Sequence, residues 1–462
     1  MHRLLRAVVL LTLVVFAASC SDDGGDASSS DDVGTDASGS GDTGDDVAID
    51  TGGSGDTTAD ADAMSDVGLP PECVGEPGPA PDYVPVACPG QHDVEVVDTR
   101  VIVPGDGIPA EAEAQNSNNN LDVIRFEGRV WLVWRTSPDH FAGPETRIHV
   151  VSSTDEQTWR YEASFSRATD LREPRFLVHD DRLFLYLAEL GTNRLDFEPR
   201  ATLYSVRDGD GGWSELAEMG LPNFIAWRVR TVDGVPMMIG YSGGENVYDF
   251  DGEPVFVELL TTDDGITWTA FDPDRRVVSE GGGSEADFAF RPDGSLVAVI
   301  RNEAGDEMGL GSKVCTAPAD DVTEWTCAPD PRKYDSPLLF ARDGEVYVVG
   351  RRNVTPTGHY ELDRPDVPVL GRAVLAQAEY TAAPKRCSLW RVEPTTGQVV
   401  FILDLPSRGD TCFASILEGD ADDELILYNY TSPLDGDEDP SWREGQDGPT
   451  QVVRHVLRFS AR

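Results

Sequence analysis

Lysine is almost absent from this sequence, and positive charge as a whole is scarce. The 462 residues include three lysines, Lys313, Lys333 and Lys385, and 37 basic side chains face 83 acidic ones, for a net charge of −46. Nucleic acids and anionic membrane surfaces are bound through concentrated lysine and arginine. We therefore expect neither as a direct partner, and arginine supplies nearly all the positive charge available to a binding site.

Helical periodicity and the usual cofactor motifs are also lacking. The glycine-rich stretch SEGGGSE at 279–285 is not followed by the helix that phosphate binding requires. No cysteine has zinc-site spacing or a nearby histidine, and no twelve-residue EF-hand loop is present. We expect a fold made of strands, with no cofactor and no metal.

The one long apolar run lies at the start of the chain. In residues 1–20, MHRLLRAVVLLTLVVFAASC, two arginines precede the apolar run and small residues precede Cys20, which is the layout of an export signal. The ending AASC resembles the lipobox of bacterial lipoproteins, in which the cysteine is lipidated. We expect Cys20 to carry a lipid anchor and to be the only contact with a membrane; plain secretion is the alternative. The protein is then exported and anchored at the bacterial outer membrane, with the cell surface and the periplasm both open.

Large apolar residues and basic residues are missing from the next fifty positions. Residues 21–70 hold 14 aspartates and no lysine or arginine, so this segment cannot bury enough surface to fold and is expected to be a disordered linker. An N-terminal extension, 71–117, follows. Six cysteines remain after Cys20, an even number in an exported chain. The pairs expected are Cys73 with Cys88, Cys315 with Cys327, and Cys387 with Cys412.

From about residue 118 to 462 the chain repeats one pattern of apolar strand, tight polar turn and second apolar strand. Six such hairpins lie at 123–134, 175–187, 228–241, 288–300, 338–350 and 415–428, about 50 residues apart. Their turns, among them VDG, PDG and RDG, have β-hairpin chemistry. Six units at this period predict an all-β, six-bladed β-propeller, closed by the strand at 92–103. Two stacked β-sandwiches are the alternative, although they do not explain the repeat.

Two later turns carry a second pattern. TTDDGITW at 261–268 fits Ser/Thr-x-Asp-x-Gly-x-Thr-Trp, and STDEQTW at 153–159 is a shortened version with Glu156 in place of glycine. Asp263 is expected to accept backbone N–H bonds, Gly265 to adopt a positive φ and Trp268 to fill the blade. These turns resemble the Asp boxes of sialidases and related BNR-repeat propellers. The resemblance identifies the fold and not a reaction.

The hairpins also bring charges together. A hairpin places the residue before its first strand and the residue after its second strand at the same end, so Glu285 and Arg301 are expected to be neighbours on one face of the ring. Comparable positions in other blades hold Asn119, Arg135, Arg172, Glu189, Trp227, Arg228, Tyr241, Asp335, Arg351, Asp410, Phe413, Tyr428 and Tyr430. We expect this channel mouth to be the ligand site. Alternatively, each arginine only neutralises a neighbouring carboxylate and braces the blades.

The fourth hairpin resembles a sialidase segment and implies roles for several residues. In that family a glutamate polarises a nucleophilic tyrosine and three arginines clamp a carboxylate; Glu285 and Arg301 match two of these positions, Arg386 a third-arginine position, and Asp139 the general acid. Asn119 stands where the family has its first arginine, and Phe413 stands where it has the tyrosine. The predicted catalytic residues are Glu285, Asp139 and Asp410. The predicted substrate-binding residues are Arg135, Arg172, Arg228, Arg301, Arg351, Arg386, Trp227, Tyr241 and Tyr428.

These observations support two functions of different kinds. The first is an exo-acting glycoside hydrolase on acidic or polar glycans, for which paired carboxylates are the chemical requirement. His140, beside Asp139, is an alternative acid. The second is a monomeric lipoprotein whose propeller binds a glycan or a protein at the cell envelope without chemistry, which the loss of the tyrosine favours. A structural envelope component is a third, weaker interpretation.

Overall fold

The computed structural model describes residues 90–462, apart from 195, 248–252, 395 and 437. The expected export signal with Cys20, the linker and the Cys73–Cys88 pair lie outside these residues. Within the described part, no helix is both long and apolar enough to cross a membrane. Strands account for most of the regular structure there, as the sequence predicts.

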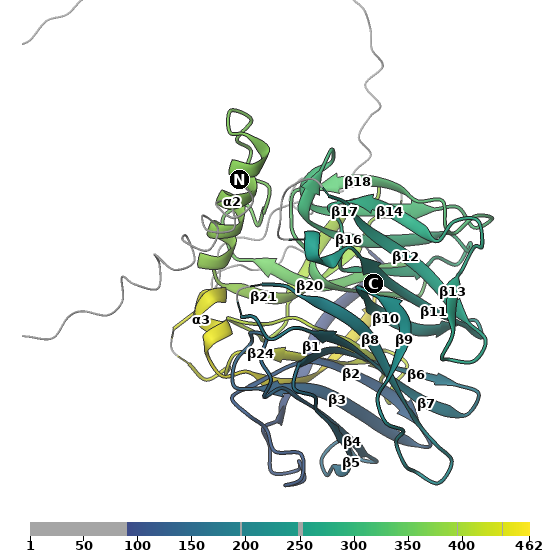
Figure 1. The fold of residues 1–462 in the computed structure, drawn as a ribbon. Helices are drawn as coiled ribbons and strands as arrows, with labels where there is room; N and C mark the ends of the chain where they lie inside the picture. Colours follow the sequence, from purple (N-terminus) through teal and green to yellow (C-terminus); the bar gives the residue numbers. More distant parts are fainter. Residues whose placement is uncertain (1–89, 195, 248–252, 395, 437) are drawn as a thin grey trace, which may run out of the picture. The chain divides into compact units, whose positions relative to one another are not determined.

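The strands form six antiparallel sheets that surround one axis as blades (Figure 1). Within each of the first five blades the strands pair in chain order, except that the fifth strand of blade 3 pairs with the third. The first strand lies innermost, next to the first strands of the neighbouring blades. The first three blades contain β2 (Ser117–Phe126), β3 (Arg129–Ser137), β4 (Arg147–Ser153) and β5 (Arg160–Phe165); β6 (Asp170–His179), β7 (Arg182–Leu190), β8 (Pro199–Arg207) and β9 (Ala217–Pro222); and β10 (Phe224–Val232), β11 (Val235–Ser242), β12 (Val255–Thr262), β13 (Trp268–Ala270) and β14 (Val277–Gly281).

The remaining blades complete the ring. Blades 4 and 5 contain β15 (Ala286–Phe290), β16 (Leu296–Asp306), β17 (Gly309–Ala317) and β18 (Thr326–Asp330); and β19 (Asp335–Arg342), β20 (Glu345–Asn353), β21 (Lys385–Val392) and β22 (Val399–Asp404). Blade 6 contains β23 (Ser415–Glu418), β24 (Glu424–Thr431) and β25 (Gln451–Ala461), and its outer strand is β1 (His92–Val103). Because β1 pairs with β25, from His92 opposite Ala461 to Val103 opposite Val452, the two ends of the described chain close the propeller. The predicted six-bladed fold is confirmed.

Apolar side chains fill the spaces between neighbouring blades. Trp131 and Val133 of blade 1 pack with Leu185 of blade 2, and Trp390 of blade 5 packs with Val299 of blade 4. These side chains are almost fully buried. Alternate residues of each strand therefore enter the two interblade spaces, which is why the strands read as nearly continuous apolar runs.

The two turns that carry the aspartate pattern have the same geometry, with one correction to the expected roles. Asp264, and not Asp263, accepts hydrogen bonds from the backbone N–H groups of Ile266 and Thr267, at 2.7 and 2.6 Å. Asp155 does the same for Gln157 and Thr158, at 2.8 Å each. These N–H donors stabilise the carboxylate and lower the pKa of Asp264 and Asp155. The aspartate of the pattern at 261–268 is therefore Asp264, one residue later than the sequence alignment placed it.

Gly265 and Glu156 occupy the same place in these two turns and both have positive φ, 75° and 54°. Trp268 is buried, as expected, and packs against Tyr186 of the neighbouring blade with ring centroids 5.8 Å apart. The turns therefore lock the outer strands of blades 1 and 3 to the apolar interior.

Two α-helices interrupt the β pattern within the described residues, and neither was predicted from the sequence. α2 (Val369–Ala382) lies between β20 and β21, and its buried residues Ala373, Ala376 and Tyr380 follow helical spacing. α3 (Trp442–Asp447) lies between β24 and β25 and begins at Ser441, which forms a capping box with Glu444. Tyr380 and Trp442 join the two helices, with ring centroids 5.4 Å apart.

Two of the expected disulfides lie within the described residues. Cys315 and Cys327 face each other on β17 and β18 of blade 4. Cys387 on β21 is bonded to Cys412, which precedes β23. The second bridge therefore joins blade 5 to the segment that brings the chain into blade 6.

Candidate functional site

The inner strands are interrupted at the same end of the propeller. The pairing register shifts between Asn119 and Leu121, Arg172 and Arg175, Ala226 and Arg228, and Asp335 and Leu338 in blades 1, 2, 3 and 5. Three of these bulges contain a non-glycine residue with positive φ, namely Asn120 (39°), Glu173 (52°) and Ser336 (53°), and Cys412 (81°) holds such a φ before β23. Such backbone strain is typical of functional sites. We call this end of the channel the mouth.

Glu285 and Arg301 meet at the mouth, as the hairpin predicts. Arg301 Nη1 lies 2.9 Å from Glu285 Oε1, and the backbone N–H of Ser336 donates to Glu285 Oε2 at 2.7 Å. Burial raises the pKa of Glu285 to about 7, with Asp335 and Glu173 adding to the rise and Arg301 opposing it. Glu285 as a whole residue keeps 8% exposure.

Asp335 is the second carboxylate of the mouth and differs from Glu285 in its surroundings. It is fully buried, accepts hydrogen bonds from Arg351 Nη1 at 3.0 Å and the Tyr380 hydroxyl at 2.6 Å, and lies 3.6 Å from Lys333 Nζ. Burial acts to raise its pKa, but Lys333, Arg351 and Arg301 outweigh burial and lower the pKa. Asp335 therefore stays ionised.

Arg301 brings the carboxyl groups of Glu285 and Asp335 close together. Arg301 Nη1 contacts Glu285 Oε1 at 2.9 Å and lies 3.9 Å from Asp335 Oδ1. The two oxygens are thus at most about 7 Å apart, which is below the upper limit of roughly 9.5 Å between the carboxyl groups of glycosidases. Asp335 is held ionised, whereas Glu285 has a pKa of about 7 and can carry a proton near neutral pH. Acid–base chemistry requires one carboxyl group of each kind.

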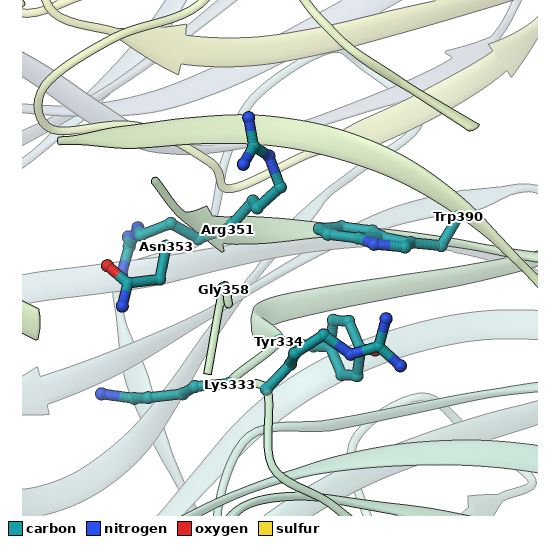
Figure 2. A pocket seen from close by; sticks show the side chains of 8 residues that line it. Lys333, Tyr334, Arg351, Asn353, Gly358 and Trp390 are labelled. Carbon is teal, nitrogen blue, oxygen red and sulfur yellow. The ribbon is translucent and has the colours of Figure 1, made fainter. Parts of the chain in front are cut away.

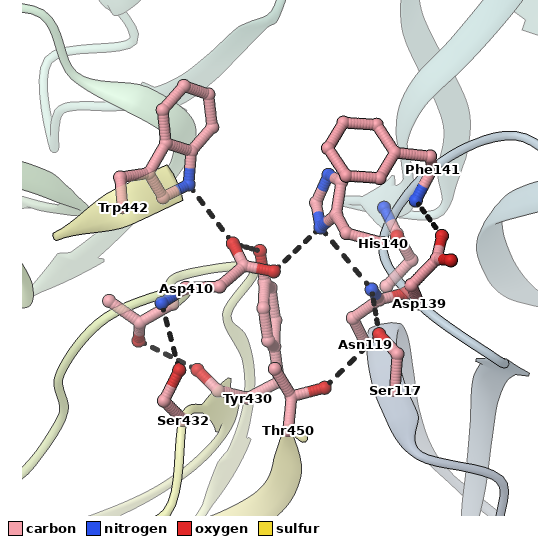
Figure 3. Close-up of polar contacts among 12 residues, drawn as sticks. Ser117, Asn119, Asp139, His140, Phe141, Asp410, Tyr430, Ser432, Trp442 and Thr450 are labelled. Atoms are coloured by element: carbon pink, nitrogen blue, oxygen red, sulfur yellow. Dashed lines mark hydrogen bonds and ion pairs between the residues drawn. The ribbon is translucent and has the colours of Figure 1, made fainter. Parts of the chain in front are cut away.

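A third polar group of the mouth centres on Asp410 (Figure 3). His140 Nδ1 lies 2.6 Å from Asp410 Oδ2, and the Tyr430 hydroxyl and Trp442 Nε1 donate to Asp410 Oδ1 at 3.0 and 3.1 Å. Burial acts to raise the pKa of Asp410, but His140 outweighs burial, and Arg351 and Tyr430 assist, so the pKa is lowered. Arg351 Nη2 also contacts the Tyr430 hydroxyl at 3.3 Å, which links this group to Asp335.

Blades 1 and 2 contribute a buried cluster of arginines around Asp170. Arg135 and Arg172 both bond Asp170, Arg135 Nη2 at 3.0 Å and Arg172 Nε at 2.7 Å. Arg135 also donates to the side-chain oxygen of Asn119 at 3.2 Å, and Arg172 donates to the backbone carbonyl of His140 at 3.1 Å. Arg135 is fully buried, so it fixes the position of Asn119, whereas Arg172 keeps some exposure.

Below the mouth, the channel is filled. The guanidinium of Arg228 donates to the backbone carbonyls of Ser336, Pro337 and Ala414, at 2.8 to 3.2 Å. The ring of Phe413 packs edge-on against Trp227 at 5.4 Å, and the Arg175 guanidinium lies 4.2 Å from the centre of the Phe413 ring. Burial lowers the pKa of Arg228 to about 9. These residues form a floor, so Arg228 and Trp227 close the site from below.

Four other predicted residues have partners outside this centre. Asp139 lies beside His140 (Figure 3), and its carboxylate bonds Arg194 Nη1 at 2.6 Å. Arg386 forms a two-bonded ion pair with Asp439. The Tyr428 hydroxyl donates to Glu156 at 2.5 Å, between blade 6 and a turn of blade 1, so it does not face the mouth. Tyr241 is buried beside Trp227. Tyr430, two residues after Tyr428, is the blade 6 tyrosine at the mouth.

A small pocket opens beside the mouth in blade 5, where Trp390 and Tyr334 lie close together (Figure 2). Its lining includes four cations, and each has a carboxylate partner: Arg332 with Asp330, Lys333 with Glu303, Arg351 with Asp335 and Arg352 with Asp404. The pocket therefore belongs to the interior of the blade. Elsewhere among the described residues, no group of three or more histidine, cysteine or acidic side chains is arranged to hold a metal.

Several residues of the mouth were missed in the sequence analysis. Tyr380 and Trp442 enter from the two unpredicted helices, and Lys333 precedes β19 as one of only three lysines. Glu173, in the DLREP segment, bonds Asn120 Nδ2 at 2.8 Å. The rarity of lysine was the one available signal, because a buried cation needs a partner and tends to mark a polar site.

Comparison with known proteins supports the fold. No protein-family model and no curated protein matches the chain. Among solved structures, a protein of unknown function from Dyadobacter fermentans is 15% identical, with a TM-score of 0.52, over 79% of this chain and 99% of the other. At this identity the likeness shows the fold alone.

Two other solved structures are carbohydrate-active proteins. Trypanosoma rangeli sialidase is 15% identical with a TM-score of 0.47 over 74% of this chain, which spans 55% of the sialidase's length. Zg3597, a family 117 glycoside hydrolase from Zobellia galactanivorans, is 14% identical with a TM-score of 0.35 over 58% of this chain. The fold and the site geometry together define the protein as a six-bladed β-propeller that carries a cluster of polar side chains at one end of its channel.

Proposed function

We propose that the protein is a glycoside hydrolase that acts at the channel mouth on acidic or otherwise polar glycans. The observation that carries the proposal is Glu285. Its carboxyl contacts Arg301, its pKa is about 7, and ionised Asp335 lies within about 7 Å of it. A proton donor of this kind, next to a carboxylate that stays charged, is what cleavage of a glycosidic bond needs.

Arginines at the same mouth support a polar or acidic substrate. Arg172, Arg301 and Arg351 keep side-chain exposures of 12%, 8% and 6%. Guanidinium N–H groups bind carboxylates and sugar hydroxyls well, because they present several donors in a fixed plane. The surrounding carboxylates balance these charges, so we propose that the arginines orient the substrate through hydrogen bonds.

The closed floor supports action at the end of a glycan chain. Trp227, Arg228 and Phe413 fill the channel below the mouth, so a ligand enters from one side and does not pass through. A blind site accepts a terminal sugar more readily than the middle of a chain. We therefore propose exo-acting hydrolysis.

A second function is favoured by one specific observation. Phe413 stands where sialidases have a tyrosine, and it lacks the hydroxyl that attacks an anomeric carbon. A propeller that binds a glycan or a protein without cleaving it is the alternative function.

The cell location is part of the same proposal. Residues 1–20 have the layout of an export signal ending at Cys20, and the aspartate-rich stretch 21–70 has the composition of a spacer. We propose that a lipid on Cys20 anchors the protein at the bacterial envelope. Metabolic labelling with an alkyne fatty acid, compared between the full-length chain and a Cys20→Ala variant, tests this point; labelling of both chains would contradict it.

Activity is tested with a panel of fluorogenic glycosides that includes sialosides, uronides and neutral sugars. The proposal expects release of the fluorophore from at least one acidic or polar member, and its loss in Glu285→Gln. A glycan array with the same protein separates the alternative. Glycan binding without any turnover would establish the binding function and overturn the hydrolase.

A further inference from the structure

The tyrosines of the mouth are not free to act as nucleophiles. Phe413 has no hydroxyl, and the hydroxyls of Tyr430 and Tyr380 donate to Asp410 and Asp335 at 3.0 and 2.6 Å. Burial next to these carboxylates raises the pKa of both tyrosines well above its usual range, so neither ionises. Asp335 and Asp410 are themselves fully buried. The tyrosine route that the sialidase resemblance implies is therefore closed, and water is the remaining attacking group to consider.

His140 is placed to activate that water. The Oδ1 atom of Asp410 accepts hydrogen bonds from the Tyr430 hydroxyl and Trp442 Nε1, so Asp410 acts as an acceptor. The Nδ1 atom of His140, 2.6 Å from Asp410 Oδ2, then carries the proton. In the form of His140 that can accept a proton, the lone pair lies on Nε2, to which no described residue donates a hydrogen bond. The His140 side chain is 18% exposed, and imidazole is the side chain best suited to proton transfer near neutral pH.

The loop of His140 is fixed from three sides. Its backbone N–H donates to the Gln446 carbonyl at 3.2 Å, its carbonyl accepts from Arg172 at 3.1 Å, and its ring packs edge-on against Phe141 at 6.2 Å. Asn119 Nδ2 lies 3.5 Å from Nδ1 (Figure 3), but both nitrogens are donors in this tautomer, so Asp410 is the acceptor that fixes the ring. The ring is thus held with Nδ1 facing the protein, which is the arrangement that a histidine base needs.

We propose that His140, oriented by Asp410, is the base that activates water at the mouth, so that glycoside cleavage here proceeds by single displacement with inversion. The inference rests on the proposed hydrolase function and adds its base and its stereochemistry. Water loses a proton to His140 Nε2, and its oxygen bonds to the anomeric carbon. The bond from that carbon to the leaving oxygen breaks with its electron pair, and the leaving oxygen takes the proton of Glu285. Solvent then removes the proton from His140 and returns one to Glu285, so the enzyme is restored.

The kinetic test uses the cleaved fluorogenic glycoside and three variants. We expect His140→Ala to reduce kcat roughly 100-fold or more, which is the usual contribution of a general base. We also expect added imidazole to restore part of that rate. Asp410→Asn should lower kcat more than it changes KM, because Asp410 is a positioning residue. His179→Gln is the matched control, since His179 bonds the Asp263 carbonyl on a distant turn, and it should keep full activity.

Two further readouts do not depend on the size of a rate. Proton NMR of the first-formed product should show the anomer opposite to that of the substrate. ¹⁵N NMR of the histidine-labelled protein should show His140 protonated at Nδ1, with a changed state in Asp410→Asn. Only seven histidines are present, so assignment by substitution is practical.

The outcomes distinguish a failure of this inference from a failure of the proposed hydrolase function. Turnover with retention, full activity in His140→Ala, or an Nε2-protonated His140 would overturn the inference and leave the hydrolase standing. Retention would instead favour a carboxylate nucleophile such as Glu173. An absence of turnover across the whole panel would overturn the hydrolase and the inference together.

Discussion

Arg301 is joined to Glu285 twice. Its backbone N–H donates to the Glu285 carbonyl at 2.8 Å, and its Nη1 atom contacts Glu285 Oε1 at 2.9 Å. The same nitrogen lies 3.1 Å from Glu303 Oε2. The first strand pair of blade 4 therefore fixes Glu285 and Arg301 in one geometry. Arg301, which lowers the pKa of Glu285, is held in contact with it.

The pH dependence of cleavage should follow Glu285. A proton donor works only while protonated, so kcat/KM should fall as the pH rises above about 7, the pKa of Glu285. Arg301 lowers that pKa, whereas burial, Asp335 and Glu173 raise it. Arg301→Gln should therefore move the alkaline limb of the pH–rate profile to higher pH. A limb that stays in place or moves to lower pH would contradict the assignment.

Restoring a tyrosine at position 413 should not create a sialidase-type nucleophile. Phe413 is only 2% exposed, with the Arg175 guanidinium over its ring face and Trp227 at its side. A hydroxyl at the ring edge would be buried without an evident partner, so Phe413→Tyr should lose roughly 1 to 3 kcal/mol of unfolding free energy. Urea unfolding and turnover of a fluorogenic sialoside measure both effects. A variant as stable as the parent and newly active on the sialoside would show that the floor is open.

The Cys387–Cys412 disulfide should matter for activity more than the Cys315–Cys327 disulfide. The first closes a 25-residue separation and ends two residues after Asp410, whereas the second closes 12 residues within blade 4. Replacing either pair by serine should remove roughly 2 to 4 kcal/mol of stability. Only the Cys387→Ser, Cys412→Ser double variant should also lower kcat/KM, because it loosens the segment that holds Asp410. Equal losses of kcat/KM in the two double variants would count against this role.

The closing blade should be sensitive to acid through His455. This residue is fully buried on β25, where its Nδ1 atom lies 2.9 Å from the Thr99 hydroxyl of β1, and burial lowers its pKa to about 4. The unfolded chain binds a proton near pH 6.5 and the folded chain does not, so stability is present above that pH and is lost as the pH falls toward 4. The loss amounts to about 3 kcal/mol.

His455→Gln removes the titrating group and keeps a polar side chain. Urea unfolding at pH 7.5 and pH 4.5 should therefore show a smaller loss of stability for the variant than for the parent protein. A loss of the same size in both proteins would mean that other groups cause the acid sensitivity.

The sequence predicts the propeller and the meeting of Glu285 with Arg301, because both follow from local hairpin geometry. Two strands with a PDG turn between them place their outer ends together whatever the rest of the chain does. These features need no knowledge of how distant segments pack.

Features that depend on bulges or on long-range packing were not predicted. The register shift between Ala226 and Arg228 turns Arg228 into the channel floor, and a bulge leaves no clear mark in a sequence. Tyr428 and Tyr430 share one face of β24, so alternation alone cannot tell which of them reaches the mouth. Tyr380 and Trp442 enter from inserted helices whose docking depends on contacts far apart in the chain.

The central claim, that Glu285 is the proton donor of a hydrolase, is tested most directly by kcat/KM of Glu285→Gln on a glycoside with a poor leaving group. Glutamine keeps the shape of the side chain and can still meet Ser336, but it cannot donate a proton to a leaving oxygen. Glu215→Gln, an exposed substitution away from the mouth, is the matched control.

We predict a fall of roughly 100- to 10,000-fold for Glu285→Gln. Most of that activity should return on an otherwise identical substrate whose leaving group needs no proton, while Glu215→Gln stays at the parent value. A Glu285→Gln protein that cleaves the poor-leaving-group glycoside at the parent rate would contradict the claim.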